Sequence, residues 1–341
     1  MVPGKPRKVE EFGGAFDAEE VQKIKNTVGL RQVYRVPPGQ TAGDLCNEAA
    51  NALLDDLGWD RNSVDGLIMV TQFPDYICPA TACVAHGKLG LSVSAFAYDV
   101  NLGCSGYVYG LWMASQAVAS GTAKRVLLLA GDTSSQVLSP EDKSVAMLFG
   151  DAGTATALEF DTSASVMSYM LGTDGTGYEN LIVPAGGFRQ RPTAEAFVRT
   201  KGNDGGVRSP MEIYMDGLAI FNFTLQRVGP LVRDTLELHG WETEQVDGFL
   251  FHQANGFMLT TLAKKMKLPI DRVPLNIGKY GNTSMSSIPL LLADDFSERL
   301  RESTPQNLLL AAFGIGYSWA AMATTLSRLT SAKVIGLEAR A

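Results

Sequence analysis

The stretch Tyr98-Asp99-Val100-Asn101-Leu102-Gly103-Cys104-Ser105-Gly106 sets the fold and the chemistry of this chain. An extended run leads into it, and the apolar residues 107–119 that follow predict a helix. Cys104 therefore stands where a helix begins, and the free backbone N–H groups and the positive dipole end found there favour a thiolate. Gly103 and Gly106 allow another backbone or a substrate to approach the sulfur. The stretch predicts that Cys104 is a nucleophile rather than a small buried hydrophobe.

A nucleophilic cysteine needs a base or a hydrogen-bond donor, and the chain has only three histidines. His86 lies within a predicted helix. His239 lies in the last turn of another helix, where a histidine interacts well with the negative helix end. His252 differs from both, because it follows the strand-like residues 246–251 and precedes a helical stretch. Sites of α/β proteins gather at the C-terminal ends of strands, so His252 is the predicted partner of Cys104.

A third polar residue stands in the glycine-containing turn of residues 280–289. Asn282 precedes a predicted helix there, and considered alone it would be an N-cap. Together, Cys104, His252 and Asn282 form a Cys/His/Asn set spread along the chain. Such a set predicts nucleophilic acyl chemistry.

Two sequence fragments recur at one separation. Gly58-Trp59 and Gly240-Trp241 lie 182 positions apart, and so do Val64-Asp65-Gly66 and Val246-Asp247-Gly248. Each copy follows an amphipathic helical segment and precedes an apolar, strand-like run. The period is far too long for a solenoid, so the recurrence predicts two duplicated halves.

Five motifs resemble the β-ketoacyl-acyl-carrier-protein synthase III family of the thiolase-like superfamily, in the order expected and over nearly the whole chain. They occupy residues 101–106, 149–153, 252–255, 280–289 and 312–319. The resemblance implies an α/β fold, a five-layered αβαβα sandwich of two duplicated halves. Residues 1–165 would form the half with the nucleophilic cysteine, and residues 166–341 the half with His252 and Asn282. Each half would contain a mixed five-stranded sheet.

The resemblance also implies roles for single residues. Cys104, His252 and Asn282 would be catalytic, and the backbone N–H groups of Cys104 and Ile315 would form the oxyanion hole. Ile315 stands where the family commonly has glycine, and its larger side chain is expected to narrow the neighbouring pocket. Related elongating synthases carry a second histidine in place of the asparagine, which favours the type III branch here. Three further residues are expected to bind substrate: Asn255, Gly217 and Cys78.

The expected reaction has two stages. A thioester first acylates Cys104, and malonyl-carrier protein then loses carbon dioxide and attacks the acyl group. Neutral His252 and the Asn282 amide would donate hydrogen bonds to the enolate oxygen. Two alternatives remain open: the same acyl-cysteine could be transferred to a hydroxyl or amine, or the chain could be a non-catalytic partner subunit of a heterodimeric enzyme. The intact Cys/His/Asn set argues against the second.

Other positions depart from the family. The residues that usually clamp the coenzyme A adenine correspond to Lys23 and Thr27, a further coenzyme contact corresponds to Leu218, and a phosphate-contacting arginine corresponds to Lys143. A carrier-protein thioester or an unusual acyl group is therefore expected to be a better donor than free acyl-coenzyme A. The sequence also starts beyond the place where the family's first β-strand would lie, so we expect that strand to be either absent or not represented in this sequence.

Composition is that of a soluble enzyme, with 45% hydrophobic and 19% charged residues. No apolar run approaches the roughly 18 to 20 residues that span a bilayer, so we expect a cytoplasmic protein without membrane contacts. The net charge of −7 argues against a nucleic-acid partner. The cysteines lack metal-ligand spacing, and no cofactor is expected; Cys104 should be the only one that is alkylated rapidly.

The expected partners follow from the resemblance. An acyl carrier protein is itself acidic, so docking would need a basic patch, for which Lys264, Lys265 and Lys267 are candidates. These lysines also fit a plain solvated helix face. A homodimer is expected, with residues 78–86 near its interface beside the acyl pocket.

Overall fold

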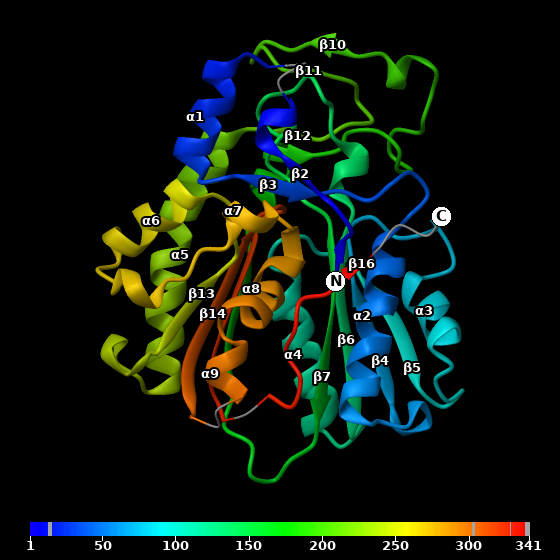
Figure 1. The fold of residues 1–341 in the computed structure, drawn as a ribbon, viewed down its shortest axis with the longest axis vertical. Helices are drawn as coiled ribbons and strands as arrows, with labels where there is room; N and C mark the ends of the chain where they lie inside the picture. Colours follow the sequence, from blue (N-terminus) through cyan, green and yellow to red (C-terminus); the bar gives the residue numbers. More distant parts are fainter. Residues whose placement is uncertain (13–15, 302–303, 328, 338–341) are drawn as a thin grey trace.

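The computed structural model describes residues 1–12, 16–301, 304–327 and 329–337, and its elements stack in five layers (Figure 1). Helices α4 (Gly106–Ala119) and α8 (Ser287–Asp295) lie between two sheets and bury apolar side chains against strands of both. Helices α2 (Ala42–Leu57) and α3 (Thr81–Leu89) cover the outer face of one sheet. Helices α5 (Gly217–His239) and α6 (Gly256–Lys265) cover the other. The predicted αβαβα sandwich is confirmed.

The first sheet has the strand order β5-β4-β6-β7. Its strands are β5 (Phe96–Val100), β4 (Gly66–Val70), β6 (Arg125–Asp132) and β7 (Ala152–Glu159). Strand β4 runs parallel to both of its neighbours, and β7 runs antiparallel to β6. Every residue of β4 is buried, as expected of a central strand that has helices on both faces.

The second sheet has the order β13-β14-β15-β8. Its strands are β13 (Gly248–Phe251), β14 (Gln306–Gly314), β15 (Ser318–Leu326) and β8 (Ser168–Thr173). Strands β13, β14 and β15 repeat the directions of β4, β6 and β7. The first strands of the two sets begin at Gly66 and Gly248, the separation of the repeated fragments. The proposed boundary between residues 165 and 166 lies in the connection from β7 to β8.

The prediction of five strands in each sheet is wrong for the part of the chain that the structure describes, where each of the two sheets has four strands. In the second sheet β8 lies beside β15. At the matching edge of β7, Met1 and Gly153 exchange two backbone hydrogen bonds of 2.8 and 3.0 Å, and among the described residues no strand pairs with the rest of this edge. After Met1 the chain turns away and pairs with β16 (Gly336–Leu337). A cavity of about 630 Å³, lined by β7, α2 and residues 329–335, lies along this edge.

The remaining elements are short and surround the two sheets. They are β1 (Val2–Pro3), β2 (Pro6–Lys8), α1 (Ala18–Val28), β3 (Gln32–Tyr34), β9 (Leu181–Ile182), β10 (Thr200–Lys201), β11 (Val207–Arg208), β12 (Tyr214–Met215), α7 (Ile277–Tyr280) and α9 (Ser297–Arg301). Within the described ranges, no helix is both long and apolar enough to cross a membrane.

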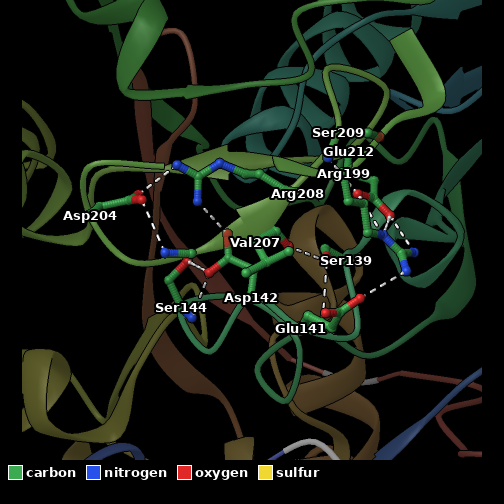
Figure 2. Close-up of polar contacts among 11 residues, drawn as sticks. Ser139, Glu141, Asp142, Ser144, Arg199, Asp204, Val207, Arg208, Ser209 and Glu212 are labelled. Atoms are coloured by element: carbon green, nitrogen blue, oxygen red, sulfur yellow. Dashed lines mark hydrogen bonds and ion pairs between the residues drawn. The ribbon is translucent and has the colours of Figure 1, made fainter. Parts of the chain in front are cut away.

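Residues 184–216 form a cap at one end of the molecule, where β10, β11 and β12 lie (Figure 1). Two arginines of the cap hold it to the loop of residues 139–144 (Figure 2). Arg208 contacts Asp142 at 2.7 Å and Asp204 at 2.6 Å, and Arg199 contacts both Glu212 and Glu141. Beneath these ion pairs, cap residue Ile213 joins an apolar cluster that Ile315 packs against. The cap and Ile315 thus contact the same apolar cluster.

Replacing Arg208 with alanine is expected to destabilise the protein strongly. The Asp142 side chain is only 1% exposed, and losing its partner would leave a buried carboxylate unpaired, which commonly costs about 3–5 kcal/mol. Arg208→Lys should recover only part of this, because an ammonium lacks the planar fork that holds two carboxylates. Urea denaturation measures the effect, with the exposed Arg233→Ala as control. Equal midpoints for the Arg208→Ala and Arg233→Ala variants would contradict this assignment.

Candidate active site

Cys104 lies in the tight connection between β5 and α4. The Gly106 N–H donates to the Gly103 carbonyl at 2.7 Å, and the helix begins immediately after Cys104 and Ser105. The backbone N–H groups of Ile315 and of Cys104 itself hydrogen-bond to the sulfur and lower the thiol pKa. Burial has the larger effect and raises the pKa of Cys104 to about 11. Burial therefore opposes the thiolate that the helix start favours, and the group is a thiol at neutral pH.

Two glycines allow the chain to approach Cys104 closely. A Cβ atom on Gly314 would lie 2.8 Å from the Cys104 sulfur, which is impossible without movement. A Cβ atom on Gly103 would lie 2.3 Å from Cγ2 of Ile315 and 2.4 Å from Oε1 of Gln72. The Ile315 side chain therefore fills space beside the nucleophile.

His252 follows β13 directly and is 1% exposed. Its Nδ1 lies 2.8 Å from the Ser287 hydroxyl, and its ring also hydrogen-bonds to the backbone of Ser284. Burial lowers the pKa of His252 to about 3. The imidazole is neutral at physiological pH and offers a hydrogen-bond donor, whereas a protonated imidazolium would be strongly disfavoured.

Asn282 is held in place by its backbone and its side chain. Its N–H donates to the Leu148 carbonyl at 2.9 Å, and its carbonyl accepts from Gly150 at 3.0 Å. Its Oδ1 accepts from the Ser284 N–H at 2.9 Å, so Nδ2 is the side-chain atom with donor capacity to spare. Asn282 does not act as the simple N-cap that its sequence position alone would favour, since that side chain bonds two residues ahead in a turn.

Ser284 is the common neighbour of these residues, and the sequence interpretation missed it. Its N–H donates to Oδ1 of Asn282 at 2.9 Å. Its side chain lies near enough to Cys104 to lower the pKa of that thiol, and its backbone near enough to His252 to raise the pKa of that imidazole. Its φ of 52° lies in the left-handed region, which a serine rarely adopts. The motif of residues 280–289 contains this serine, but nothing in the local pattern predicts its backbone conformation.

The expected substrate-binding residues come from three separate segments. Asn255 caps α6, its Oδ1 accepting from Met258 N–H at 3.2 Å, and Gly217 is the first residue of α5. Cys78 is exposed in the loop before α3, as is Cys83 within that helix. Access alone favours Cys78 and Cys83, so the expectation that Cys104 alone is alkylated rapidly stays a prediction.

The positions that depart from the coenzyme A clamp are on the surface. Lys23 and Thr27 are exposed on α1, and Lys143 lies 3.7 Å from Glu20 on the same helix. Leu218 is 70% exposed in the first turn of α5. Among the proposed docking lysines, Lys265 donates to the Leu225 carbonyl at 2.9 Å, which ties α6 to α5.

Known proteins resemble this chain in both sequence and structure. The family model described as 3-oxoacyl-[acyl-carrier-protein (ACP)] synthase III matches residues 98–175, and its C-terminal counterpart matches residues 236–326. The chain is 36% identical over 307 residues to β-ketoacyl-[acyl-carrier-protein] synthase III 2 of Streptomyces coelicolor, covering 89% of this chain and 85% of that protein.

Solved structures agree with the sequence matches. The 3-oxoacyl-(acyl-carrier protein) synthase from Burkholderia xenovorans LB400 has a TM-score of 0.93 and 44% identity, covering 99% of this chain and 95% of that one. The synthase III from Pseudomonas aeruginosa PAO1 has a TM-score of 0.81 and 29% identity, with 96% of each chain covered.

A five-layered fold whose site gathers at the start of its two central helices is that of a thiolase-like condensing enzyme. Within that class, the chain belongs to the 3-oxoacyl-acyl-carrier-protein synthase III family, also called β-ketoacyl-acyl-carrier-protein synthase III. It is an acyltransferase of this family, and the family implies acyl-carrier-protein thioesters as substrates. The predicted family is confirmed.

Proposed function

We propose that the protein forms an acyl-Cys104 intermediate and condenses it with malonyl-carrier protein by decarboxylative Claisen condensation, in fatty-acid or related acyl-chain biosynthesis. The observation that carries this proposal is the position of Ser284, which is bonded to Asn282 and borders both Cys104 and His252. The residues supply a nucleophile and two neutral donors, the set that an enolate-forming condensation requires.

Each step of the proposed reaction uses particular groups of the site. The Cys104 sulfur attacks the thioester carbon, and the thiol of the donor leaves. His252 and Nδ2 of Asn282 then donate hydrogen bonds to the thioester oxygen of the malonyl group as carbon dioxide departs. The resulting enolate carbon attacks acyl-Cys104, and the backbone N–H groups of Cys104 and Ile315 hold the tetrahedral oxygen. Those two groups already face the sulfur.

The low pKa of His252 supports condensation over transfer to a hydroxyl or amine. Transfer to a hydroxyl needs a general base that accepts its proton, and efficient bases have a pKa near the working pH. A histidine whose pKa is about 3 is a poor base at pH 7 but a good neutral donor. The intact mass of the protein with a panel of acyl thioesters, followed by a chase with malonyl-carrier protein or with hydroxyl and amine acceptors, tests this choice. Release of the acyl group only by the latter acceptors would refute condensation.

We expect the donor to be carried by a protein. Because Lys23, Thr27 and Leu218 are not the residues of the family's coenzyme A clamp, acetyl-coenzyme A should acylate Cys104 more slowly than the matching acyl-carrier protein at equal concentration. The pantetheine arm would still pass Asn255 and Gly217 to reach the sulfur. Intact-mass time courses of the two donors measure the difference. Faster acylation by the coenzyme A thioester would show that other residues have rebuilt the clamp.

We also propose a homodimer. Tyr76 and Ile77, which precede the expected interface residues 78–86, are 57% and 83% exposed, an unusual exposure for neighbouring large apolar side chains. Solution scattering at micromolar concentration tests the assembly, and a monomeric mass would exclude it. The Ile77→Asp variant should weaken the dimer.

A further inference from the structure

A buried carboxyl group lies next to the nucleophile, and the proposed reaction does not use it. Asp132 is the last residue of β6 and is 1% exposed. Its Oδ1 accepts from the Thr71 hydroxyl at 3.1 Å and from the Gln72 N–H at 3.0 Å. Its Oδ2 is buried with no partner of regular geometry among the described residues. Burying a carboxyl oxygen without a hydrogen-bond partner destabilises the folded protein. Its presence beside the site therefore indicates a functional role.

Ser284 connects this carboxyl group to Cys104. Its side chain interacts with both groups and lowers the pKa of each by hydrogen bonding, and the charge of Asp132 in turn raises the pKa of the Cys104 thiol. The contact with Asp132 is looser than a regular hydrogen bond, as is common for catalytic contacts before substrate binds. The left-handed backbone of Ser284 aims its hydroxyl at these two groups while its N–H remains bonded to Asn282.

The thiol proton needs an acceptor other than His252. Cys104 is protonated at rest, and its proton must leave as the sulfur attacks. Burial makes the imidazole too weak a base for this step. The pKa of Asp132 is raised to about 7, mainly by burial, so this carboxyl group is partly ionised at physiological pH and can take up a proton.

We propose that Ser284 and Asp132 form a proton relay for Cys104. When the sulfur bonds to the thioester carbon, the thiol proton passes to the Ser284 oxygen, and the Ser284 proton passes to the Asp132 carboxylate. Ser284 touches the reacting atom, whereas Asp132 acts only through Ser284 and is a positioning residue that stores the proton. The inference rests on the proposed acyl-Cys104 intermediate.

Every proton is accounted for over acylation and condensation. In acylation the carbon–sulfur bond of the donor breaks, its thiolate leaves and takes a proton from water, and the Cys104 proton remains on Asp132. In condensation the enolate carbon bonds to the acyl carbon and expels the Cys104 thiolate. That thiolate recovers the stored proton through Ser284, which restores the resting thiol and the Asp132 carboxylate.

The pH profile of Cys104 alkylation by iodoacetamide tests the relay without any acyl donor. Peptide mapping follows Cys104 separately from the exposed Cys78 and Cys83. The wild-type rate should rise as pH passes through about 7, where Asp132 ionises, and then level off. In Asp132→Asn this rise should vanish, and the rate at pH 8 should fall by about 100-fold, the usual contribution of a general base. The rate should then increase only at the high pH that ionises the thiol.

The direction in which the Asp132→Asn substitution changes the alkylation rate distinguishes the proton relay from a simple electrostatic effect. If Asp132 acted only as a nearby negative charge, removing it would lower the thiol pKa and make alkylation at pH 8 faster. Faster alkylation in Asp132→Asn, or an unchanged profile, would overturn the proposal. The other titratable groups around Asp132 are Cys104, Cys46 on α2 and Asp151 before β7. Asp151→Asn should keep the rise near pH 7, which assigns it to Asp132.

Two serine variants, Ser284→Gly and Ser286→Ala, distinguish loss of the relay from a general loss of folding. Ser284→Gly removes the hydroxyl while suiting the positive φ, and it should abolish the rise as Asp132→Asn does. Ser286 lies in the same short turn, but its hydroxyl donates to the carbonyls of Ala130 and Ala152, so Ser286→Ala should keep the wild-type profile. Thermal denaturation checks that each variant is folded. A wild-type profile in Ser284→Gly would refute the relay even if Asp132→Asn did not fold. If the pH profiles of Cys104 alkylation are as predicted but the protein does not catalyse condensation, the proposed function is contradicted and the relay is not.

Discussion

Cys104→Ala is expected to abolish the acyl-enzyme and condensation while malonyl-carrier protein still loses carbon dioxide. The variant lacks the sulfur that carries the acyl group, so no mass increase should appear with any thioester. His252 and Asn282 are held by Ser284, Ser287 and backbone groups rather than by the thiol, and their donors should remain in place. The enolate would then take a proton from water and give acetyl-carrier protein.

Intact mass of the carrier protein and release of labelled carbon dioxide measure the two outcomes. Cys83→Ala is a matched control, since that cysteine is exposed on α3 and should leave both stages unchanged. Acylation of the Cys104→Ala variant at another residue would show that Cys104 is not the nucleophile.

Local sequence was enough to propose three candidate residues of the site. Cys104 stands between glycines at a helix start, His252 at a strand end and Asn282 in a glycine-containing turn, and each of these signals lies within about ten residues. The repeated fragments likewise predicted the two matching strand sets, because helix, turn and strand occur at the same spacing in both halves.

Properties set by distant parts of the chain could not be predicted in this way. The pKa of Cys104 depends on burial beneath residues more than 200 positions later, so the favourable helix start was overruled by desolvation. Asp132 ends a strand whose pattern looks purely structural, and only the fold shows that it reaches Ser284. The ion pairs of Arg208 join its own segment, which includes Asp204, to the distant loop that contains Asp142.

Removing the hydrogen-bond donors to the enolate is expected to impair condensation and to leave acylation of Cys104 intact. His252→Ala and Asn282→Ala should each lower condensation by about 100- to 1000-fold, the usual effect of deleting one oxyanion donor, while Cys104 is still acylated. Acylation should continue because the backbone N–H groups of Cys104 and Ile315 serve that step. Single-turnover rates for each stage provide the measurement.

Two features make this test decisive for the role of the histidine. If His252 were instead the base that activates Cys104, His252→Ala would slow acylation and condensation equally, whereas Asn282→Ala would slow only condensation. His252→Gln should retain part of the condensation rate, because an amide N–H can replace a neutral imidazole donor but cannot replace a base. Because the pKa of His252 is depressed to about 3, its donor form persists on acidification, and decarboxylation should show no loss near pH 6.5, where an ordinary histidine becomes charged. A loss of decarboxylation centred near pH 6.5 that disappears in His252→Gln would show that the imidazole titrates normally and is not buried as a neutral donor.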